Sequence, residues 1–568
     1  MEAEKLLKLV EKYESLIYET ADHIWKHPET GYREWKTSAY MEEQFEKLGY
    51  TLVRAGNIPG FYADLDTGRP GPKIAILGEL DSLIVANHPD ADPETAAVHA
   101  CGHNAQSGIL VGVAAALKEP GALDGLCGSI RFISVPAEEL IELGYREELR
   151  KQGIIKYYGG KVEFIYRGYF DGVDISMMIH SGKLAEGKTL SIGKGSNGCI
   201  TKNITFKGVS SHAGGSPQSG RNALYAATCG LNAVNALRET FVDDQHIRFH
   251  PIITEAGLAV NAIPEKAKVE SYVRGASFES IYEYNKKVNR ALAASAAAIG
   301  CNVELDDHPG YFPLNNDPNL AKVMTEAMET ISGPGTVIDD GTWSTGSTDM
   351  GDVSAIMPAI HPHCSGSIGI GHGKDYYVAD KKLGCLYPAQ CLVLTAAMLL
   401  SDGAAKAKQV IAESKPYFKS KEEYLAAIDK LTMDKDTDIY NDDDTITPDY
   451  CKSTGRDSHA RFSRSGIIQT VTIPQKEKDQ NPVSRTAGPL FFFSLFSVLL
   501  PVLPAELFRL PFRYGSAVGV DLKFIFHIIV DQLALIFQPS VVPFQMQENI
   551  FRGSARNPLQ NGLAHLLF

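Results

Sequence analysis

Helical and strand patterns alternate along the first third of the chain, and this order restricts the possible folds strongly. The start of the chain, up to Ile24, has helical spacing of its apolar residues. Residues 73–77 and 129–135 are short apolar runs typical of buried strands, and 106–117 has an apolar, Ala/Gly-rich helical pattern. Residues 1–195 are therefore predicted to form the first part of an α/β domain.

A second pattern follows, in the order strand, helix, strand, strand, helix, strand. This order predicts a ferredoxin-like α+β domain over residues 196–306, inserted into the larger domain. Two later helical patterns would complete the larger domain over residues 307–412. The expected strands are 200–209, 247–255, 266–273 and 302–305, and the expected helices are 221–237, 278–299, 319–331 and 379–400.

Size, charge and cysteine usage narrow the class of protein. A chain of 568 residues is too long for one hydrophobic core. The net charge of −13, without a cluster of Lys and Arg, argues against nucleic-acid binding. Nine Cys without regular spacing indicate a reducing compartment, and the charged N-terminus has no signal-peptide pattern. The expected location is the cytoplasm.

The end of the chain, residues 413–568, is predicted to be a tail of unknown structure. Residues 434–449 are acid-rich and are expected to form a solvated loop. The apolar stretch 490–503 is shorter than the roughly twenty residues of a spanning helix. Charged residues interrupt 516–537. We therefore expect no membrane span, and a C-terminal membrane anchor is the weaker alternative.

The chemistry begins with Cys101 and His103, which are separated by a single glycine. Taken alone, such a pair is more often a buried Cys beside a structural His. Gly102, however, allows a tight turn that lets both side chains converge. Thiolate, imidazole and carboxylate are the groups that hold a borderline-soft divalent metal. Further His residues and a carboxylate pair elsewhere in the chain favour the metal site.

Glu138 and Glu139 form that carboxylate pair, at the end of an apolar strand pattern. Adjacent residues point in different directions, so one can bind a metal while the other takes a proton from the attacking water. The alternative is a solvated acidic pair. His180 follows another apolar stretch and is either a ligand or a satisfied core histidine.

Three further groups are weaker candidates. Glu79 and Asp81 alternate, so both carboxylates would lie on one side, where one could orient a ligand imidazole. Near the end of the core, any one of three His could complete a two-metal set, and His212 in the inserted domain could stabilise an oxyanion. Those three are His361, His363 and His372.

Together these residues resemble the di-metal aminoacylase and carboxypeptidase family of peptidases. The branch that is most similar contains p-aminobenzoyl-glutamate hydrolase, auxin-conjugate hydrolases and β-alanyl-dipeptidase-like proteins. The resemblance covers residues 5–410 and rests on an ordered set of motifs. These are His-Ala-Cys-Gly-His-Asn over 99–104, Pro-Ala-Glu-Glu over 136–139, Ser-His-Ala-Gly-Gly-Ser-Pro over 211–217 and Gly-Arg-Asn-Ala over 220–223.

The resemblance implies a zinc-peptidase-like domain with a mixed central sheet flanked by helices, and an inserted lid or dimerisation domain. It also implies a role for each matching residue. Cys101 would bridge two metal ions, zinc or manganese, and His103, Glu139, His180 and His372 would complete the ligand set. Glu138 would be the general base, Asp81 the orienting carboxylate, and Asn261 and Arg274 the substrate-binding groups. His212 would complete the site of the partner subunit in a homodimer.

Two departures from the branch stand out. Glu79 replaces a more usual Asp, and Ala105-Gln106 lacks the His of the auxin-conjugate group, which weakens the case for an auxin-type substrate. The expected function is metal-dependent hydrolysis of the amide bond of a small N-acyl or aminobenzoyl amino acid, or of a dipeptide. The alternative is a non-catalytic protein that binds a metal or ligand. Every expected ligand is present, which favours the enzyme.

Overall fold

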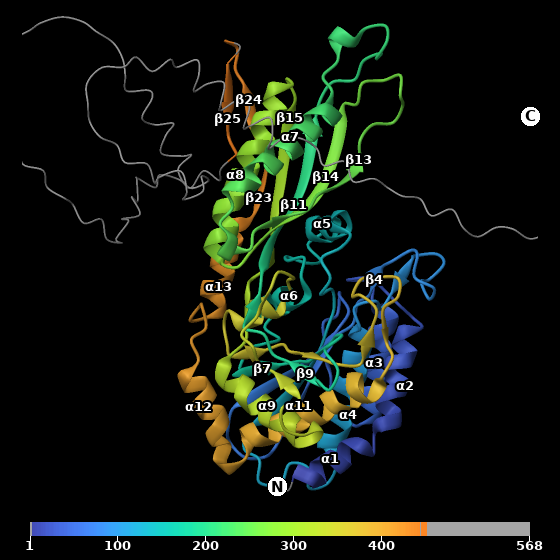
Figure 1. The fold of residues 1–568 in the computed structure, drawn as a ribbon, viewed down its shortest axis with the longest axis vertical. Helices are drawn as coiled ribbons and strands as arrows, with labels where there is room; N and C mark the ends of the chain where they lie inside the picture. Colours follow the sequence, from blue (N-terminus) through green and yellow to red (C-terminus); the bar gives the residue numbers. More distant parts are fainter. Residues whose placement is uncertain (1–2, 444, 451–568) are drawn as a thin grey trace, which may run out of the picture. The chain divides into compact units, whose positions relative to one another are not determined.

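A computed structural model describes residues 3–443 and 445–450 of the chain. All of these described residues belong to one compact unit. Within the described residues, two six-stranded sheets dominate the architecture (Figure 1). The apolar stretches 490–503 and 516–537 lie outside the described residues.

The first sheet is mixed. Strand β2 pairs antiparallel with the edge strand β1 and with β6, and β6, β3, β7 and β19 run parallel to one another. The predicted strand 129–135 is confirmed at both ends, and 73–77 extends by two residues. In sheet order, the strands are β1 (Val53–Arg54), β2 (Phe61–Asp66), β6 (Ser129–Val135), β3 (Lys73–Glu79), β7 (Ile175–Met177) and β19 (Ala359–Ile360).

Helices cover both faces of this sheet, because its central strands are apolar on both sides. Along β3, Ile74 and Ile76 pack into one hydrophobic core, whereas Ala75 and Leu77 pack into the other. The first core includes α1 (Ala3–Glu11), α2 (Glu14–Trp25), α3 (Trp35–Lys47), α4 (His103–Lys118), α9 (Pro318–Ser332), α11 (Tyr387–Leu400) and α12 (Ala405–Glu413). The second includes α5 (Leu143–Lys151), α6 (Gly160–Tyr166), α10 (Met350–Ser354) and α13 (Lys421–Ile428). The α/β class and the mixed central sheet are thus confirmed.

Helix α4 is the central helix of the first core. Every residue of α4 except Lys118 is buried. Gly108 and Gly112 let α2 approach closely, because a Cβ at either position would meet Ile17. The beginning of α4 is therefore held rigidly against the sheet, and this is where the Cys-Gly-His motif lies.

The second sheet is formed mainly by strands of the inserted segment, residues 196–306. All of its strand pairs are antiparallel. Four of its strands have the ferredoxin-like order β13-β14-β11-β15, and its helices also match the predicted order. The elements are β11 (Gly198–Lys207), α7 (Ala223–Leu237), β12 (Arg248–Phe249), β13 (Ile252–Glu255), β14 (Lys266–Gly275), α8 (Phe278–Ala298) and β15 (Asn302–Tyr311). The division of the chain into domains at 195, 306 and 412 stays a prediction.

Strand β15 is longer than the sequence predicts. The pattern indicates a strand over 302–305 only, and the residues beyond it include Asp307 and Pro309-Gly310, types that are depleted in strands. In the structure, Asp307 is fully buried and pairs with the buried Lys202 of β11 at 2.6 Å. Pro309 lies opposite Ile200 beside a register shift, a position that a strand proline tolerates.

The solvated loop expected over residues 434–449 is wrong in part, because strands lie within it. They belong to the C-terminal extension (residues 414–443 and 445–450), which continues the fold. Within the acid-rich stretch, β23 (Met433–Asp436) pairs with β15 instead of forming a solvated loop. Met433 is buried in the core of the inserted segment, and Asp436 pairs with Lys207 at 2.8 Å. A hairpin of β24 (Asp438–Tyr440) and β25 (Ile446–Pro448) follows. Within β23 the exposed Asp434 and Asp436 alternate with the buried Met433 and the half-buried Lys435, a pattern that the acid-rich composition does not reveal.

One described helix, Lys382–Leu400, has the length and composition to cross a membrane. Most of its apolar window, 83%, is buried inside the protein. It contains α11, which packs against α9, α4 and α1 in the first core. Its apolar character is that of a core helix.

Candidate metal centre

The Cys-Gly-His motif forms the turn that begins α4. Gly102 adopts a left-handed conformation with φ of 88°. A Cβ at this position would also collide with the hydroxyls of Ser181 and Tyr376. Only glycine therefore fits between Cys101 and His103, as the spacing predicts.

Two clusters of possible metal ligands share Cys101. The first contains Cys101, His103 and His180, whose ligand atoms all lie within 4.8 Å of one another. Cys101 Sγ is 3.3 Å from Nε2 of His180, which begins the short strand β8 (His180–Ser181). The other ring nitrogen of His180 lies 2.7 Å from the carbonyl oxygen of Ser181. That contact orients Nε2 toward the thiol.

The second cluster contains Cys101, Glu139 and His372. Nε2 of His372 lies 3.2 Å from Oε1 of Glu139. The backbone of His372 has a left-handed φ of 66°, and its N–H donates to the carbonyl of Ala100 at 2.9 Å. This bond ties the loop to the Cys-Gly-His turn. Of the three late His candidates, the structure thus brings His372 to Cys101.

Asp81 and Glu79 contact opposite nitrogens of the His103 ring. Nδ1 lies 3.0 Å from Oδ1 of Asp81, and Nε2 lies 3.1 Å from Oε2 of Glu79. The second Asp81 oxygen accepts the backbone N–H of Glu139 at 2.8 Å. Asp81 therefore links two of the expected ligands, which is the arrangement expected of an orienting carboxylate.

A buried lysine, which the sequence analysis did not identify, supports this region. Nζ of Lys161 contacts Oε1 of Glu79 and Oδ1 of Asp349, both at 2.5 Å. All three side chains are at most 1% exposed. Nothing in the apolar pattern around Lys161 distinguishes it from a surface lysine.

The surroundings of Cys101 and Glu139 favour the charged forms of the Cys101 thiol and the Glu139 carboxyl. Burial and the Glu139 carboxylate both favour the neutral thiol, yet the imidazoles of His180 and His103 lower the pKa of Cys101 to about 6. Burial likewise opposes ionisation of Glu139, but His372 outweighs it and lowers the pKa of Glu139 to about 2. Thiolate and carboxylate are the forms that bind metals.

Two buried atoms at the clusters make no well-directed hydrogen bond in the described part of the chain, and each has only an ion-pair contact with a neighbouring side chain. They are Nε2 of His103 and Oε1 of Glu139. Buried polar atoms in proteins are nearly always paired. Because each atom belongs to a different cluster, one cation in each cluster would satisfy both. The residues present therefore fit a two-metal site.

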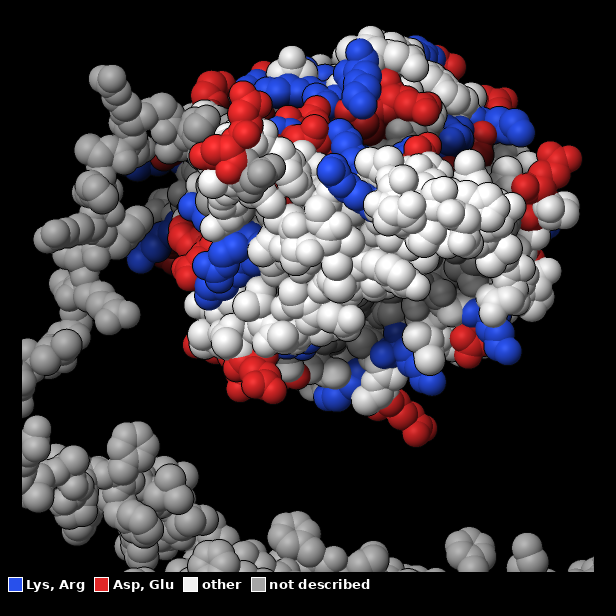
Figure 2. Space-filling view, turned by 90° about the horizontal axis from the view of Figure 1, so that it is seen from above, with Lys and Arg blue, Asp and Glu red and all other residues white. Residues whose placement is uncertain are grey.

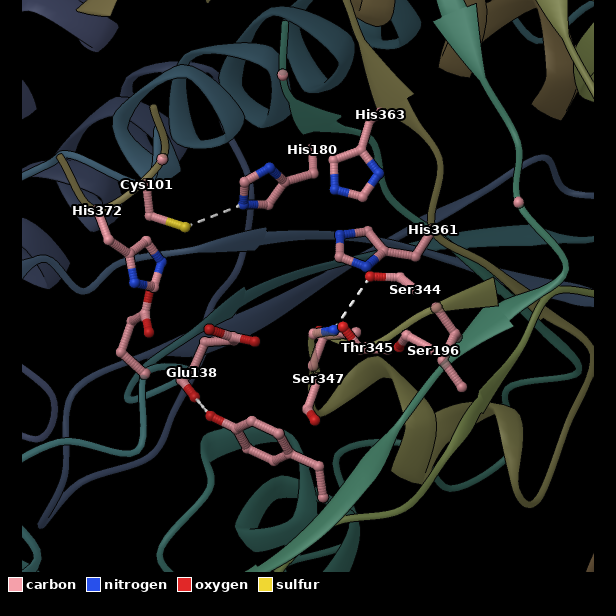
Figure 3. A pocket seen from close by; sticks show the side chains of 18 of the residues that line it. Cys101, Glu138, His180, Ser196, Ser344, Thr345, Ser347, His361, His363 and His372 are labelled. Carbon is pink, nitrogen blue, oxygen red and sulfur yellow. Dashed lines mark hydrogen bonds and ion pairs between the residues drawn. The ribbon is translucent and has the colours of Figure 1, made fainter. Parts of the chain in front are cut away.

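Glu138 lies in the same cavity as both clusters (Figure 3). It is 7% exposed, and its backbone oxygen accepts a hydrogen bond from the hydroxyl of Tyr311. Burial, together with the neighbouring carboxylates of Glu79 and Glu139, raises the pKa of Glu138 well above its usual range. Glu138 and Glu139 thus have opposite protonation preferences although they are adjacent.

The cavity has a volume of about 850 Å³, which suits a dipeptide or an acylated amino acid. Arg274 of β14 lines it and donates from Nε to His250 Nε2 at 3.0 Å. His212 and Asn261 are exposed and do not line it. Other lining residues come from several short elements and include Lys183, Ser191, Ser196, Asn316, Ser344, Thr345, Ser347, His361, His363 and Tyr376.

The chain belongs to the peptidase family M20/M25/M40, whose sequence pattern matches residues 75–390. It is 31% identical to the human Xaa-Arg dipeptidase over 390 residues, which span 66% of this chain and 83% of that protein. It is 28% identical to one of the polypeptides of p-aminobenzoyl-glutamate hydrolase from Escherichia coli K12 over 295 residues, 50% of this chain and 56% of that polypeptide.

Solved structures share the fold. A dinuclear metal-binding peptidase of the M20 family from Bacillus subtilis superposes with a TM-score of 0.51 at 20% identity, over 69% of this chain and 99% of that one. An aminobenzoyl-glutamate utilization protein from Klebsiella pneumoniae gives 0.53 at 20% identity, over 70% and 98%. The family resemblance read from the motifs is confirmed. The protein is an M20-family metallo-hydrolase of amide or peptide bonds.

Proposed function

We propose that this protein hydrolyses the amide bond of small N-acyl or aminobenzoyl amino acids, or of dipeptides. One observation supports the proposal most directly. Two clusters of possible metal ligands share Cys101, and Cys101 lines the same cavity as Glu138. Cys101, His103 and His180 would hold one zinc or manganese ion, and Cys101, Glu139 and His372 the other. Bound there, the two ions would polarise the scissile carbonyl and lower the pKa of a water molecule toward about 7.

Glu138 is the proposed general base. It would take a proton from the attacking water and return it to the leaving amine. The burial that raises its pKa helps it to keep that proton until the amine departs. The guanidinium of Arg274 would pair with the free carboxylate of the substrate. Asp81 would hold the His103 ring, as its hydrogen-bond distance of 3.0 Å allows.

We also propose a homodimer formed through the inserted segment. Viewed from above, the molecule shows a broad area without charged side chains (Figure 2). The inserted segment carries strongly exposed apolar residues: Val209, Tyr225, Ile252, Ile253, Leu258 and Val260. Because His212 and Asn261 do not line the cavity of their own chain, a second copy is the proposed place where they act. Analytical ultracentrifugation of the wild type and of Ile253→Lys tests this, and a monomeric wild type would exclude it.

Hydrolysis of a small panel by metal-loaded and chelated protein tests the reaction. The panel contains p-aminobenzoyl-glutamate, N-acetyl amino acids and dipeptides. We expect turnover that the chelator abolishes and that added zinc or manganese restores. Turnover that survives complete metal removal, or none with two ions bound per chain, would contradict the proposal.

A further inference from the structure

One wall of the cavity contains three polar side chains that find no hydrogen-bond partner among the described residues. They are His361, Ser196 and Ser347. His361 is 5% exposed and neither of its ring nitrogens is paired, and Ser196 is 7% exposed with an unpaired hydroxyl. In Figure 3 these side chains lie together, across the cavity from Cys101 and His372.

Such a group of unpaired atoms is unusual, because buried polar atoms are nearly always hydrogen-bonded. The atoms are not at the metal clusters, whose own unpaired atoms belong to His103 and Glu139. All three side chains line the cavity, so a molecule bound there can reach them. The wall is therefore a candidate subsite for part of the substrate.

The wall is built on fixed backbone. His361 directly follows β19, and its backbone N–H donates to Oδ1 of Asn316 at 2.8 Å. Ser196 lies in β10 (Gly195–Ser196), opposite Ser344 in the parallel strand β18 (Trp343–Ser344). Ser347 follows in the loop after β18, where Ser344 Oγ accepts the N–H of Gly346 at 3.2 Å. The polar groups are thus pre-positioned.

The wall offers one imidazole ring and two hydroxyls. The rings nearest to His361 are those of His180 and His363, at centroid distances of 5.7 and 5.9 Å. Within residues 3–443 and 445–450, no carboxylate hydrogen-bonds to the His361 ring. Without such a partner, both ring nitrogens are available to a bound molecule, one as an N–H donor and one as an acceptor. The two serine hydroxyls also both donate and accept.

We propose that His361, Ser196 and Ser347 form a subsite for a neutral substrate side chain that both donates and accepts hydrogen bonds, and that a carboxamide fits it best. This inference rests on the proposed amidohydrolase function. An apolar side chain would leave the polar atoms of the wall unpaired. A carboxylate, ammonium or guanidinium would be desolvated there without an acidic, lysine or arginine side chain among the three residues of the wall to pair with it.

Matched side chains on either side of the scissile bond test the subsite. The N-acetyl derivatives of Gln, Met, Glu and Arg vary the amine side, and the four dipeptides formed by these residues with a C-terminal Gly vary the acyl side. Because the subsite lies on one side of the scissile bond, we expect the preference in one of the two series. There, kcat/KM for the Gln member should exceed that for each of the other three at least about tenfold. Arg is included because one relative is named for it.

Variants of His361 then test whether this residue causes the preference for Gln. His361→Leu is expected to reduce the Gln-to-Met ratio below about threefold, and His361→Gln, which keeps a donor and an acceptor, is expected to restore it. Ser196→Ala and Ser347→Ala give the same test if the His361→Leu protein does not fold. Metal content and circular dichroism of each variant show whether the fold and both ions are retained.

The outcomes separate this inference from the proposed function. The subsite would be contradicted if chelator-sensitive turnover shows no Gln preference, or if the preference is still present in His361→Leu. Either result would still support the proposed amidohydrolase function. If no panel member turns over with metal bound, calorimetric binding of free glutamine, methionine, glutamate and arginine to the metal-loaded protein is measured instead. Selective binding of glutamine that His361→Leu removes would support the subsite, and equal binding of all four would overturn it.

Discussion

Cys101 is the residue on which the candidate metal centre depends most, because both clusters include it. We expect Cys101→Ala to lower the metal content from two ions per chain toward none. His372→Ala belongs to the second cluster only and is expected to retain about one ion. Metal analysis after dialysis measures both values. A Cys101→Ala protein that still holds two ions would show that the clusters do not bind metal through the thiol.

Glu138 gives a second prediction. Glu138→Gln keeps the shape of the side chain but cannot accept a proton, so kcat should fall by about 10²–10⁴-fold. Because Glu138 belongs to neither of the two clusters that share Cys101, the variant should keep both ions and an unchanged circular dichroism spectrum. Steady-state turnover of any panel substrate, with metal analysis on the same sample, checks this. Comparable turnover in the variant would contradict the assignment of the base.

Several site residues could be predicted because their types and spacing are those of metal ligands and of a general base. Cys101, His103, Glu138, Glu139 and His180 are specific as an ordered set. In the structure all of them except His103 line one cavity, and His103 lies beside Cys101 and His180. Pattern alone left three late His candidates open, and the contact with Cys101 depends on the path of a long loop. Serine hydroxyls, such as those of the polar wall, have no distinctive sequence pattern at all.

At the scale of helices and strands, the observed bounds agree with the predicted ones where buried residues recur with a regular period. Strand β6 matches its apolar run residue for residue, and α7 and α8 begin and end within about two residues of expectation. The far half of β15 could not be foreseen, because the partner of Asp307 is Lys202, about a hundred residues away. Tertiary pairing there outweighs a local turn signal.

Helix α6 carries the buried Lys161, whose removal should be strongly destabilising. Lys161→Met would leave Glu79 and Asp349 as buried, unpaired carboxylates and lower the free energy of unfolding by about 3–5 kcal/mol. The variant that also contains Glu79→Gln and Asp349→Asn removes all three charges and should lose less. Urea unfolding followed by circular dichroism compares the two. A Lys161→Met protein as stable as the wild type would contradict the buried network.

For the whole molecule, the C-terminal extension lies outside the residues of the family match and connects parts that lie inside it. Tyr424 is fully buried and donates to Asp352 at 2.6 Å, Asp429 accepts from Tyr157 at 2.7 Å, and β23 extends the second sheet. We expect a chain ending at residue 412 to melt about 10 °C or more below the full chain. A chain ending at residue 450 keeps these contacts and serves as the control. Equal melting of all three proteins would show that the extension adds no stability.

The position of β23 also limits how copies of this chain could join through the second sheet. In this sheet β23 covers β15 on one side, and on the other side β12 and β13 pair with β14. A sheet with open edges on both sides could add copies without end and form a fibre. Strand β23 forms one edge with only four residues, three of them charged, and such a short, charged edge resists pairing with another chain. Pairing through β13 then uses the same strand on each copy and is complete at two. The strand β23 would thus act as a built-in stop against polymerisation.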